Sequence, residues 1–416
     1  MNKVIGLYAN GLVAAWSIFS SMTMSTSLAG DWPGFLGPSG NGVVESSKVP
    51  TDFEVPHDAQ PGKNIAWRTS LAGRAVSGPI VIGDRVFTTG SSGIEQRWLE
   101  VNCLDLNDGS LKWTRKIKAT GRPYAHPTSA NAAPTPCSDG KRVYAFFSSN
   151  DLVCYDLDGN LQWFRSLAYD HPKAGNDVGM SSSPVVIGGV VVIQSESQAD
   201  SFATGFDAIT GATLWDLQRP RKANWASPCV ARGTDGQAVV LLQSSQDLVA
   251  LDPRSGSQVW KLNERCSSVP TTVAVAGKVF VPTSSLKVFD LPKAFDPPTL
   301  LWESNRVAPG NSSNLVRSDA VYAVKGSVLA AVDMSGKNLW QIRLGEIGSV
   351  WSTPVIAGDK LVLFAQNGKC VAVDLSGTEA KVSSTSELGE EVLGSPAVVG
   401  NALIVRSAKA VWKISE

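Results

Sequence analysis

The chain has 416 residues, enough for one large domain or two to three ordinary ones. Lysine plus arginine and aspartate plus glutamate both number 37, so no overall electric field attracts nucleic acid or acidic membranes. Apolar residues make up 43% of the chain and charged residues 18%, with 38 glycines and 23 prolines, which excludes a disordered protein and favours a turn-rich, mostly β one.

The N-terminal residues predict a secretory signal peptide, residues 1–29. Lys3 is the only charge before Asp31, an apolar run spans residues 4–19, and residues 27–29 form a small-x-small cleavage sequence. The run is shorter than the roughly 20 residues of a membrane-spanning helix, although a retained anchor is the alternative. We therefore expect an exported chain, periplasmic or secreted, with no integral membrane span after processing.

Residues 30–63 are rich in proline and glycine and predict an extended N-terminal arm that packs along the folded domain, residues 64–416. Six cysteines in an exported chain invite a disulfide interpretation. Cys103, Cys154 and Cys370 lie inside apolar strand patterns, however, as small buried side chains do. No C-x-x-C pair is present and only three histidines occur, so the sequence does not support a structural zinc site.

One pattern of aspartate, glycine and tryptophan recurs along the folded domain. Clear copies span residues 103–113, 154–163, 205–215, 250–260 and 331–340, and degraded copies span 288–302 and 372–382. Successive copies lie about 40 to 50 residues apart, which is the spacing of propeller blades.

A second marker, a proline after a small residue and before an apolar strand, gives the number of blades. It occurs at Pro79, Pro134, Pro184, Pro228, Pro270, Pro354 and Pro396, although Pro270 follows Val269, and Asn314 takes this place in one further copy. The last copy ends without an outer strand, and residues 64–71 supply a strand that has no inner strands before it. The sequence thus predicts an all-β, eight-bladed propeller of four-stranded antiparallel blades, closed by the N-terminal strand pairing with the C-terminal blade.

The repeated residues are expected to be structural, because a set spread round a ring cannot converge on one substrate. The glycines suit tight hairpins, the aspartates can accept hydrogen bonds from the turns, and the tryptophans can pack on the neighbouring blade. The predicted docking residues are Trp67, Trp113, Trp163, Trp215, Trp260, Trp302, Trp340, Asp105, Asp156, Asp207, Asp252, Asp333 and Asp374.

The A-x-D-x-x-x-G-x-x-x-W signature resembles the tryptophan-docking motif of pyrroloquinoline quinone (PQQ) repeat propellers. These include quinoprotein alcohol dehydrogenases and the propeller lipoprotein of bacterial outer-membrane protein assembly. The resemblance covers residues 64–416 and implies the fold, since enzymes and non-enzymes share the motif. The opening of the mature chain, DWPGFLGPSGNGV, is also similar to segments that precede such propellers in exported bacterial proteins.

Catalysis is not expected from the sequence. The resemblance implies that a quinoprotein dehydrogenase holds its cofactor with an adjacent cysteine pair, a tryptophan platform and a calcium site, and this chain has no Cys-Cys pair. Glu196, Asn131 and Asp177 could be assembled into a calcium site, but their spacing does not demand one. We expect no cofactor, with PQQ and calcium as the alternative. The lipid-attachment cysteine of the lipoprotein is also missing.

Three long polar connections are the candidate site, residues 118–133, 168–182 and 218–227. Trp225 and Trp351 precede strand-start prolines by three residues and should face each other across the channel mouth. His126 and His171 could form a metal or acid–base pair, but a third partner is lacking. The candidate ligand or partner residues are Arg122, Tyr124, His126, Asn131, His171, Asn176, Arg221, Trp225 and Trp351, with no catalytic or metal-binding residue among them.

The main functional hypothesis is an exported, non-catalytic, monomeric propeller that acts as a protein-interaction scaffold in the cell envelope. Its expected partner is another envelope protein, held through the long-loop face. A small PQQ-dependent oxidoreductase is the alternative, and a carbohydrate-binding propeller is a second one.

Overall fold

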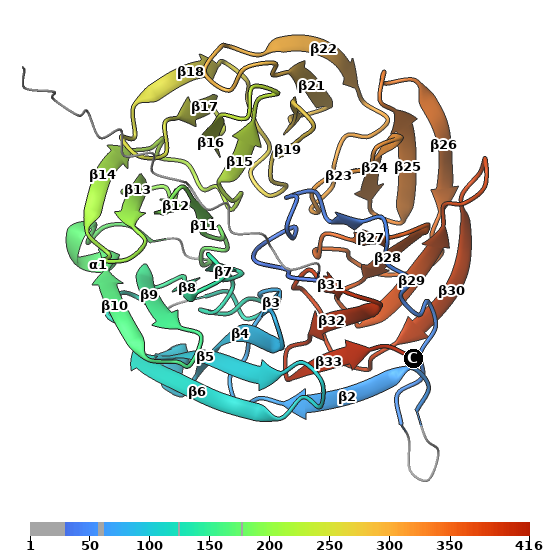
Figure 1. Ribbon diagram of the computed structural model, residues 1–416, viewed down its shortest axis with the longest axis horizontal. Helices are drawn as coiled ribbons and strands as arrows, with labels where there is room; N and C mark the ends of the chain where they lie inside the picture. The colour runs from blue at the N-terminus through green and yellow to red at the C-terminus, as the bar shows by residue number, and fades with distance from the viewer. Residues whose placement is uncertain (1–29, 57–61, 124, 176–177) are drawn as a thin grey trace, which may run out of the picture.

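The structure is a computed structural model that describes residues 30–56, 62–123, 125–175 and 178–416 (Figure 1). The predicted signal peptide lies outside these residues. Eight sheets form a closed ring, as the sequence predicts. No helix in the described residues is long and apolar enough to cross a bilayer.

Each blade has four antiparallel strands, the first lying beside the central channel and the last at the rim (Figure 1). Blades 1 to 4 consist of β3 (Ile80–Ile82), β4 (Arg85–Ser92), β5 (Trp98–Asp105) and β6 (Leu111–Lys118); β7 (Cys137–Ser138), β8 (Arg142–Phe146), β9 (Asp151–Asp156) and β10 (Leu161–Ser166); β11 (Val185–Ile187), β12 (Val190–Ser195), β13 (Phe202–Asp207) and β14 (Thr213–Gln218); β15 (Cys229–Arg232), β16 (Ala238–Gln243), β17 (Leu248–Leu251) and β18 (Gln258–Leu262).

Blades 5 to 8 consist of β19 (Val273–Val275), β20 (Lys278–Pro282), β21 (Leu286–Asp290) and β22 (Thr299–Ser304); β23 (Leu315–Val316), β24 (Ala320–Lys325), β25 (Val328–Asp333) and β26 (Asn338–Arg343); β27 (Val355–Ala357), β28 (Lys360–Phe364), β29 (Lys369–Asp374) and β30 (Lys381–Glu387); β31 (Ala397–Val399), β32 (Ala402–Arg406), β33 (Ala410–Ile414) and β2 (Ile65–Ser70). The short helices are η1 (Ile94–Gln96) and α1 (Leu167–Asp170).

The ring closes in blade 8, where the N-terminal strand β2 pairs antiparallel with the C-terminal strand β33. Arg68 lies opposite Trp412 in this pair, and Ser70 lies opposite Ala410. The prediction that the first strand of the folded domain completes the last blade is confirmed. Because the two ends of the chain share one sheet, no blade keeps an open seam.

The blades are joined at their outer strands by the tryptophans of the repeat. Six indole N–H groups donate a hydrogen bond of 2.9–3.1 Å to a carbonyl in the hairpin of the next blade: Trp67 to Leu106, Trp113 to Leu157, Trp163 to Ala208, Trp215 to Pro253, Trp260 to Ala294 and Trp302 to Met334. Trp340 differs, because no acceptor for its indole N–H is found in the described part of the chain; its ring lies 5.9 Å from that of Tyr322 in its own blade.

The repeated aspartates hold the hairpins on which the indoles rest. In six blades the carboxylate accepts one or two hydrogen bonds from backbone N–H groups of its own turn. Asp156, for example, accepts them from Asp158 and Asn160 at 3.0 and 2.8 Å. The same geometry is present at Asp105, Asp207, Asp252, Asp333 and Asp374. The aspartate fixes the turn, and the turn supplies the carbonyl that receives the indole.

The N-terminal arm crosses the centre of the ring before it reaches the rim (Figure 1). Trp32 pairs with Val81 of blade 1, and β1 (Val43–Val44) adds a parallel fifth strand to the inner edge of blade 7. Leu36, between these points, is buried in the core shared by blades 5 and 6. The arm then follows the outside of blade 7, where the N–H of Phe53 donates to Ser386 Oγ at 3.0 Å. The arm therefore spans the channel, which the sequence does not predict.

All six cysteines are free thiols, and five of them are buried. Burial raises the pKa of the Cys103, Cys229 and Cys266 thiols to about 12. They pack as small apolar side chains in the sheets, as their sequence context indicates.

Candidate functional site

A belt of side-chain hydroxyls lines the channel where the first strand of each blade begins. Seven backbone N–H groups each donate a hydrogen bond of 2.9–3.0 Å to the hydroxyl of the next blade: Gly78 to Thr135, Thr135 to Ser183, Ser183 to Ser227, Ser227 to Thr271, Thr271 to Ser313, Ser313 to Thr353 and Thr353 to Ser395. The belt runs through all eight blades and joins their inner edges, as the tryptophans join their outer edges.

The belt corrects the strand-start marker in two blades. Thr135 is the belt residue of blade 2, so the proline that follows it is Pro136 and not Pro134. In blade 5 the belt residue is Thr271, and Thr272 stands where other blades have proline; Pro270 lies two residues too early. Both errors arise because a neighbouring proline lies within two residues of the true position. The number of blades is unaffected.

The belt is interrupted at the seam between blades 8 and 1, where Gly78 is the one of its eight positions without a hydroxyl. A Cβ atom at Gly78 would lie 2.6 Å from the carbonyl oxygen of Ser395, so no side chain fits there. Blades 8 and 1 approach each other closely at this seam, where the two ends of the propeller chain meet. Glycine is required by this close approach and not by an unusual backbone conformation.

Above the belt, the channel mouth forms a pocket with a cavity volume of about 460 Å³. Its wall is a second ring of equivalent residues, each two positions before a belt residue: Val76, Ala133, Ser181, Trp225, Val269, Asn311, Trp351 and Leu393. Phe35 of the N-terminal arm also lines the pocket and is shared with a second cavity that the arm covers from the other side. The pocket is therefore a cup with the arm behind it.

Among the described residues, the lining of this mouth pocket contains no arginine, lysine, aspartate or glutamate. His126 is the one titratable side chain in that described lining, and its Nδ1 lies 2.8 Å from Thr128 Oγ1. Most of the belt hydroxyls beneath are already engaged as acceptors between blades. The pocket thus offers apolar and aromatic surface with weakly polar edges, which suits an uncharged group.

The two largest side chains of the wall are Trp225 and Trp351, on blades 4 and 7 as the sequence predicts. Trp225 is half-buried, and its Nε1 donates to the carbonyl of Gly179 at 2.8 Å. Its backbone N–H donates to Ser268 at 2.7 Å. Trp351 is 45% exposed. One indole is fixed and the other stands open to a ligand.

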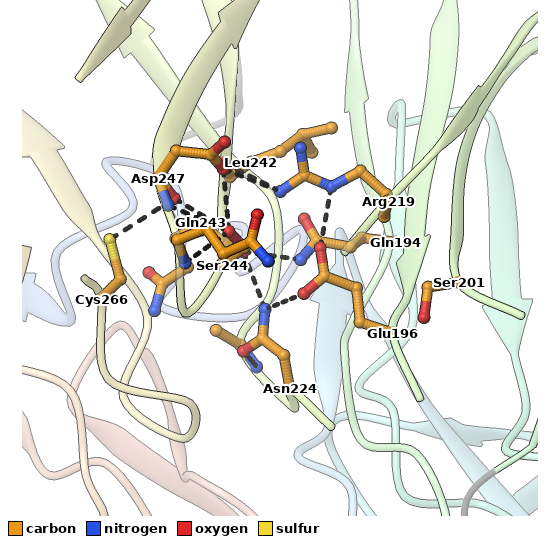
Figure 2. Close-up of polar contacts among 12 residues, drawn as sticks. Gln194, Glu196, Ser201, Arg219, Asn224, Leu242, Gln243, Ser244, Asp247 and Cys266 are labelled. Atoms are coloured by element: carbon orange, nitrogen blue, oxygen red, sulfur yellow. Dashed lines mark hydrogen bonds and ion pairs between the residues drawn. The ribbon is translucent and has the colours of Figure 1, made fainter. Parts of the chain in front are cut away.

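A buried polar network holds the loop that carries Trp225 (Figure 2). Glu196, just past β12, accepts a 2.8 Å bond from Arg219 Nε and a 3.0 Å bond from Asn224 Nδ2. Asn224 also donates to the carbonyl of Gln243 in blade 4 at 2.7 Å. Gln243 in turn accepts bonds from the backbone and hydroxyl of Thr272 in blade 5. The residue next to Trp225 is therefore tied to three blades.

Glu196 is almost fully buried, with Arg219 as its main ionic partner. Burial raises the pKa of the Glu196 carboxyl to about 7, against the opposing effect of the Arg219 guanidinium. Asp247 lies on the far side of Arg219, 3.9 Å from its Nη2, and also pairs with Lys261 at 3.1 Å. The network contains charges of both signs and has a carboxyl group that titrates near neutral pH.

The structure brings three of the nine candidate partner residues to the pocket: His126, Trp225 and Trp351. Asn131 is fully buried, where its Oδ1 accepts the N–H of Ser149 at 2.8 Å, so it supports the loop from below. His171 lies away from the pocket, stacked on Phe202 at 3.8 Å and paired with Asp216 at 3.1 Å. The two histidines therefore do not meet.

The remaining candidates lie outside the pocket or outside the described residues. Arg221 is exposed, with its Nη2 3.5 Å from Asp200 Oδ1. Arg122 is exposed and does not line the pocket. Tyr124 and Asn176 lie outside the described residues.

The calcium site considered from the sequence does not form from Glu196 and Asn131. Both Glu196 oxygens are used by Arg219 and Asn224, so a guanidinium stands where a cation would have to be. Asn131 contacts Gln96 and Ser149 instead, and Asp177 is outside the described residues. Within those residues, no group of three or more His, Cys, Asp or Glu side chains could hold a metal ion.

The sequence of the chain matches a known protein family. The family model described as "Outer membrane protein assembly factor BamB" matches residues 49–198, 173–285 and 299–416, which is most of the chain. The chain belongs to this BamB family. An outer membrane protein assembly factor BamB from Yersinia pestis is 23% identical over 312 residues, which cover 74% of this chain. The match spans only 63% of the length of that relative.

Solved structures share the fold. BamB from Moraxella catarrhalis superposes with a TM-score of 0.59 and 18% identity over 83% of this chain and 98% of that one. A europium-containing methanol dehydrogenase gives a TM-score of 0.65 and 13% identity over 92% and 91% of the two chains. A quinohemoprotein alcohol dehydrogenase from Comamonas testosteroni gives 0.67 and 13% over 94% and 81%. BamB-family and quinoprotein propellers therefore share this architecture.

The fold of the dehydrogenases raises the question whether the mouth pocket of this BamB-family chain fits PQQ. The cofactor is a polycarboxylate, so its site must supply cationic donors for the carboxylates and acidic or amide oxygens for a metal. The described lining of the pocket has no arginine, lysine, aspartate or glutamate, and it carries one amide side chain, Asn311. The residues present do not fit the cofactor.

Proposed function

We propose that this chain is an exported, non-catalytic scaffold of the bacterial cell envelope. In this proposal it binds another envelope protein through the face that bears the mouth pocket, and it takes part in the assembly of outer-membrane proteins. Membership of the BamB family supports the scaffold role. The name of these relatives, outer membrane protein assembly factor, supports a role in that assembly process.

The observation that carries the proposal is the composition of the mouth pocket. Two tryptophans from blades 4 and 7 flank a cup of about 460 Å³ whose described lining carries no arginine, lysine, aspartate or glutamate. Such a cup suits an apolar or aromatic side chain of a protein segment, because burying that side chain leaves no charge without a partner. The network around Glu196 and Asn224 fixes the loop that carries Trp225. Binding a partner therefore costs little conformational entropy in this loop, which supports a role in binding.

The test is site-specific photo-cross-linking in living cells. A photoreactive amino acid at position 351 should cross-link to a distinct envelope protein, and Trp225→Ala should weaken that product. Ile209, 65% exposed in the hairpin at the other end of blade 3, is the control position and should give no such product. Identical products from positions 351 and 209, or a product that is insensitive to Trp225→Ala, would overturn the proposal.

A small quinoprotein oxidoreductase is the second candidate, favoured by the fold shared with the two dehydrogenases. Titration calorimetry with PQQ, with and without calcium, tests it directly. Binding tighter than about 1 μM, or roughly 8 kcal/mol, that is lost in Trp351→Ala would move this candidate ahead of the scaffold. The absence of heat would remove it.

A further inference from the structure

An exposed apolar tip stands on blade 1, on the same end of the ring as the mouth pocket but outside it. It is formed by the hairpin between β4 and β5, where Ile94 is 84% exposed and Trp98 is 47% exposed. Scattered surface apolar residues are ordinary, but two large ones in one turn are not. Ile94 and Trp98 together expose apolar surface, and contact with another molecule would remove that surface from water.

The backbone of the tip is strained. Gly93, Glu95 and Gln96 have φ angles of 75°, 53° and 57°, in the left-handed region. For a residue with a side chain this conformation costs about 1–2 kcal/mol. Such a conformation persists only where the surrounding contacts hold it.

Those contacts come from Gln96 and the buried Asn131. Gln96 Oε1 accepts the backbone N–H of Asn131 at 2.8 Å and the hydroxyl of Ser91 at 2.7 Å, and Asn131 Nδ2 donates back to the carbonyl of Gln96 at 3.4 Å. Asn131 is itself anchored to Ser149 in blade 2. The tip is thus tied to two blades and presents its apolar side chains from a rigid base.

Gly93 lets the indole of Trp98 lie over the turn. A Cβ atom at Gly93 would stand 2.8 Å from Trp98 Cδ1, so any side chain there would push the ring away. The glycine therefore serves both the left-handed conformation and the position of the indole.

The charges beside the tip are mainly basic. Lys118 is exposed and lies directly opposite Trp98 in the β5–β6 pairing. Lys116 follows two residues away and contacts Glu100 at 2.9 Å, while Arg97 pairs with Glu95 within the turn itself. A partner that covers the indole would bring its own side chains next to Lys118. A carboxylate is the group that this position favours.

We propose that Ile94, Trp98 and Lys118 form a second docking site, for a protein segment that carries a large apolar side chain beside a carboxylate. Tryptophan is among the residues enriched in interface hot spots, and here it has an apolar neighbour and a flanking cation. The rigid base limits the entropy lost on binding. The site is separate from the mouth pocket and does not depend on it.

The test uses a phage-displayed library of random peptides selected on the full mature chain, with the best peptide then measured by titration. The expected peptides combine a large apolar residue with Asp or Glu. Ile94→Asp, Trp98→Ala and Lys118→Glu should each weaken the best peptide by about tenfold or more. Ile94 and Lys118 are exposed, so their variants keep the fold. Trp351→Ala, in the pocket, and Ile209→Asp, at the other end of the ring, should leave the affinity unchanged.

Three results would overturn the proposal. If the selected peptides lack acidic residues and bind the Lys118→Glu variant with unchanged affinity, the argument from the charge of Lys118 fails. Peptides that bind Ile94→Asp and Trp98→Ala as tightly as the original chain would place the contact elsewhere. Binding to vesicles of phosphatidylglycerol that depends on Ile94 and Trp98, without any peptide binding, would make the tip a membrane contact. A failure of the mouth-pocket cross-links would leave this result untouched.

Discussion

The indole of Trp163 lies against Gly211 of the following blade, and its Nε1 donates a 3.1 Å hydrogen bond to the carbonyl of Ala208 in the same hairpin. A Cβ atom at Gly211 would come within 2.6 Å of the indole. The contact explains why the repeat contains glycine and tryptophan at fixed spacing. The tryptophan of one blade packs against the glycine of the next blade, so the two residues together form one joint between blades. Four other tryptophan–glycine pairs have the same geometry, with Cβ approaches of 2.5 to 2.8 Å.

Gly211→Ala should destabilise the propeller more than Gly236→Ala. Both glycines have positive φ, 69° and 77°, so both substitutions cost about 1–2 kcal/mol in backbone strain. Only Gly211 faces an indole, since nothing lies within 4 Å of a Cβ at Gly236. The steric clash should add about 1–3 kcal/mol. Urea denaturation followed by circular dichroism measures the difference, and equal midpoints would show that the indole does not restrict this position.

Ser183→Ala should be costly, and its neighbour Ser182→Ala should not. Ser183 Oγ accepts the backbone N–H of Thr135 across the belt, and its removal leaves that buried donor unpaired at a cost of about 1–3 kcal/mol. Ser182 Oγ is buried without a hydrogen-bond partner in the described residues, so its loss is expected to be neutral or stabilising. Thermal unfolding of the two variants provides the comparison. A larger loss for Ser182→Ala would contradict the structural role of the belt.

Trp302→Phe should destabilise the fold more than Trp340→Phe. Both tryptophans are half-buried on outer strands, and each variant loses the same part of the ring. Trp302 also gives up a 3.0 Å hydrogen bond to Met334, while the described residues give the Trp340 indole no such bond to lose. The difference in unfolding free energy should be about 1 kcal/mol. The reverse order would mean that ring packing, and not the hydrogen bond, governs these joints.

Glu196→Gln should change how stability depends on pH. Burial raises the folded pKa of Glu196 to about 7 from 4.5, so the folded state holds its proton more tightly than the unfolded state does. The stability that this group contributes is full below pH 4.5, falls as the pH rises through this interval, and is flat above about pH 7. The variant has no proton to lose, so the free-energy difference between wild type and variant should decline by up to about 3 kcal/mol over that interval.

The measurement for Glu196 is urea denaturation of both proteins at a series of pH values from below 4.5 to above 7. Glu379→Gln, which removes an exposed carboxylate, controls for the loss of one negative charge. A difference that rises with pH would mean that Arg219 outweighs burial and keeps the carboxyl ionised.

The blades could be predicted because each of them repeats the same local chemistry. Apolar strands, glycine hairpins and the Asp–Gly–Trp spacing recur, so the number of blades and the pairing of β2 with β33 follow from the sequence. The belt was missed although its signal is present, since a serine or threonine comes directly before the strand-start residue in seven blades. The prolines at 134 and 270 obscured that signal.

The site could be predicted only in part, because the position of a residue along the chain does not determine how deeply its side chain is buried. Trp225 and Trp351 follow from their equivalence in the repeat, and both reach the pocket. His171 and Asn131 lie in the expected loops, yet one turns toward Phe202 and the other is buried beneath the blade 1 tip. Glu196, Arg219 and Asn224 are isolated polar residues in the sequence. Their contacts form only when three blades pack together, so no local sequence pattern predicts them.

The N-terminal arm also sets an order of events during synthesis. Val43 and Val44 pair with β27, and the side chain of Asn41 donates to the carbonyl of Val316 at 2.8 Å, so the arm rests on blades that come late in the chain. Strand β2 must likewise wait for β33. The earliest residues of the ring therefore stay unpaired until the last have been made, and they need protection from other exposed strands in that interval.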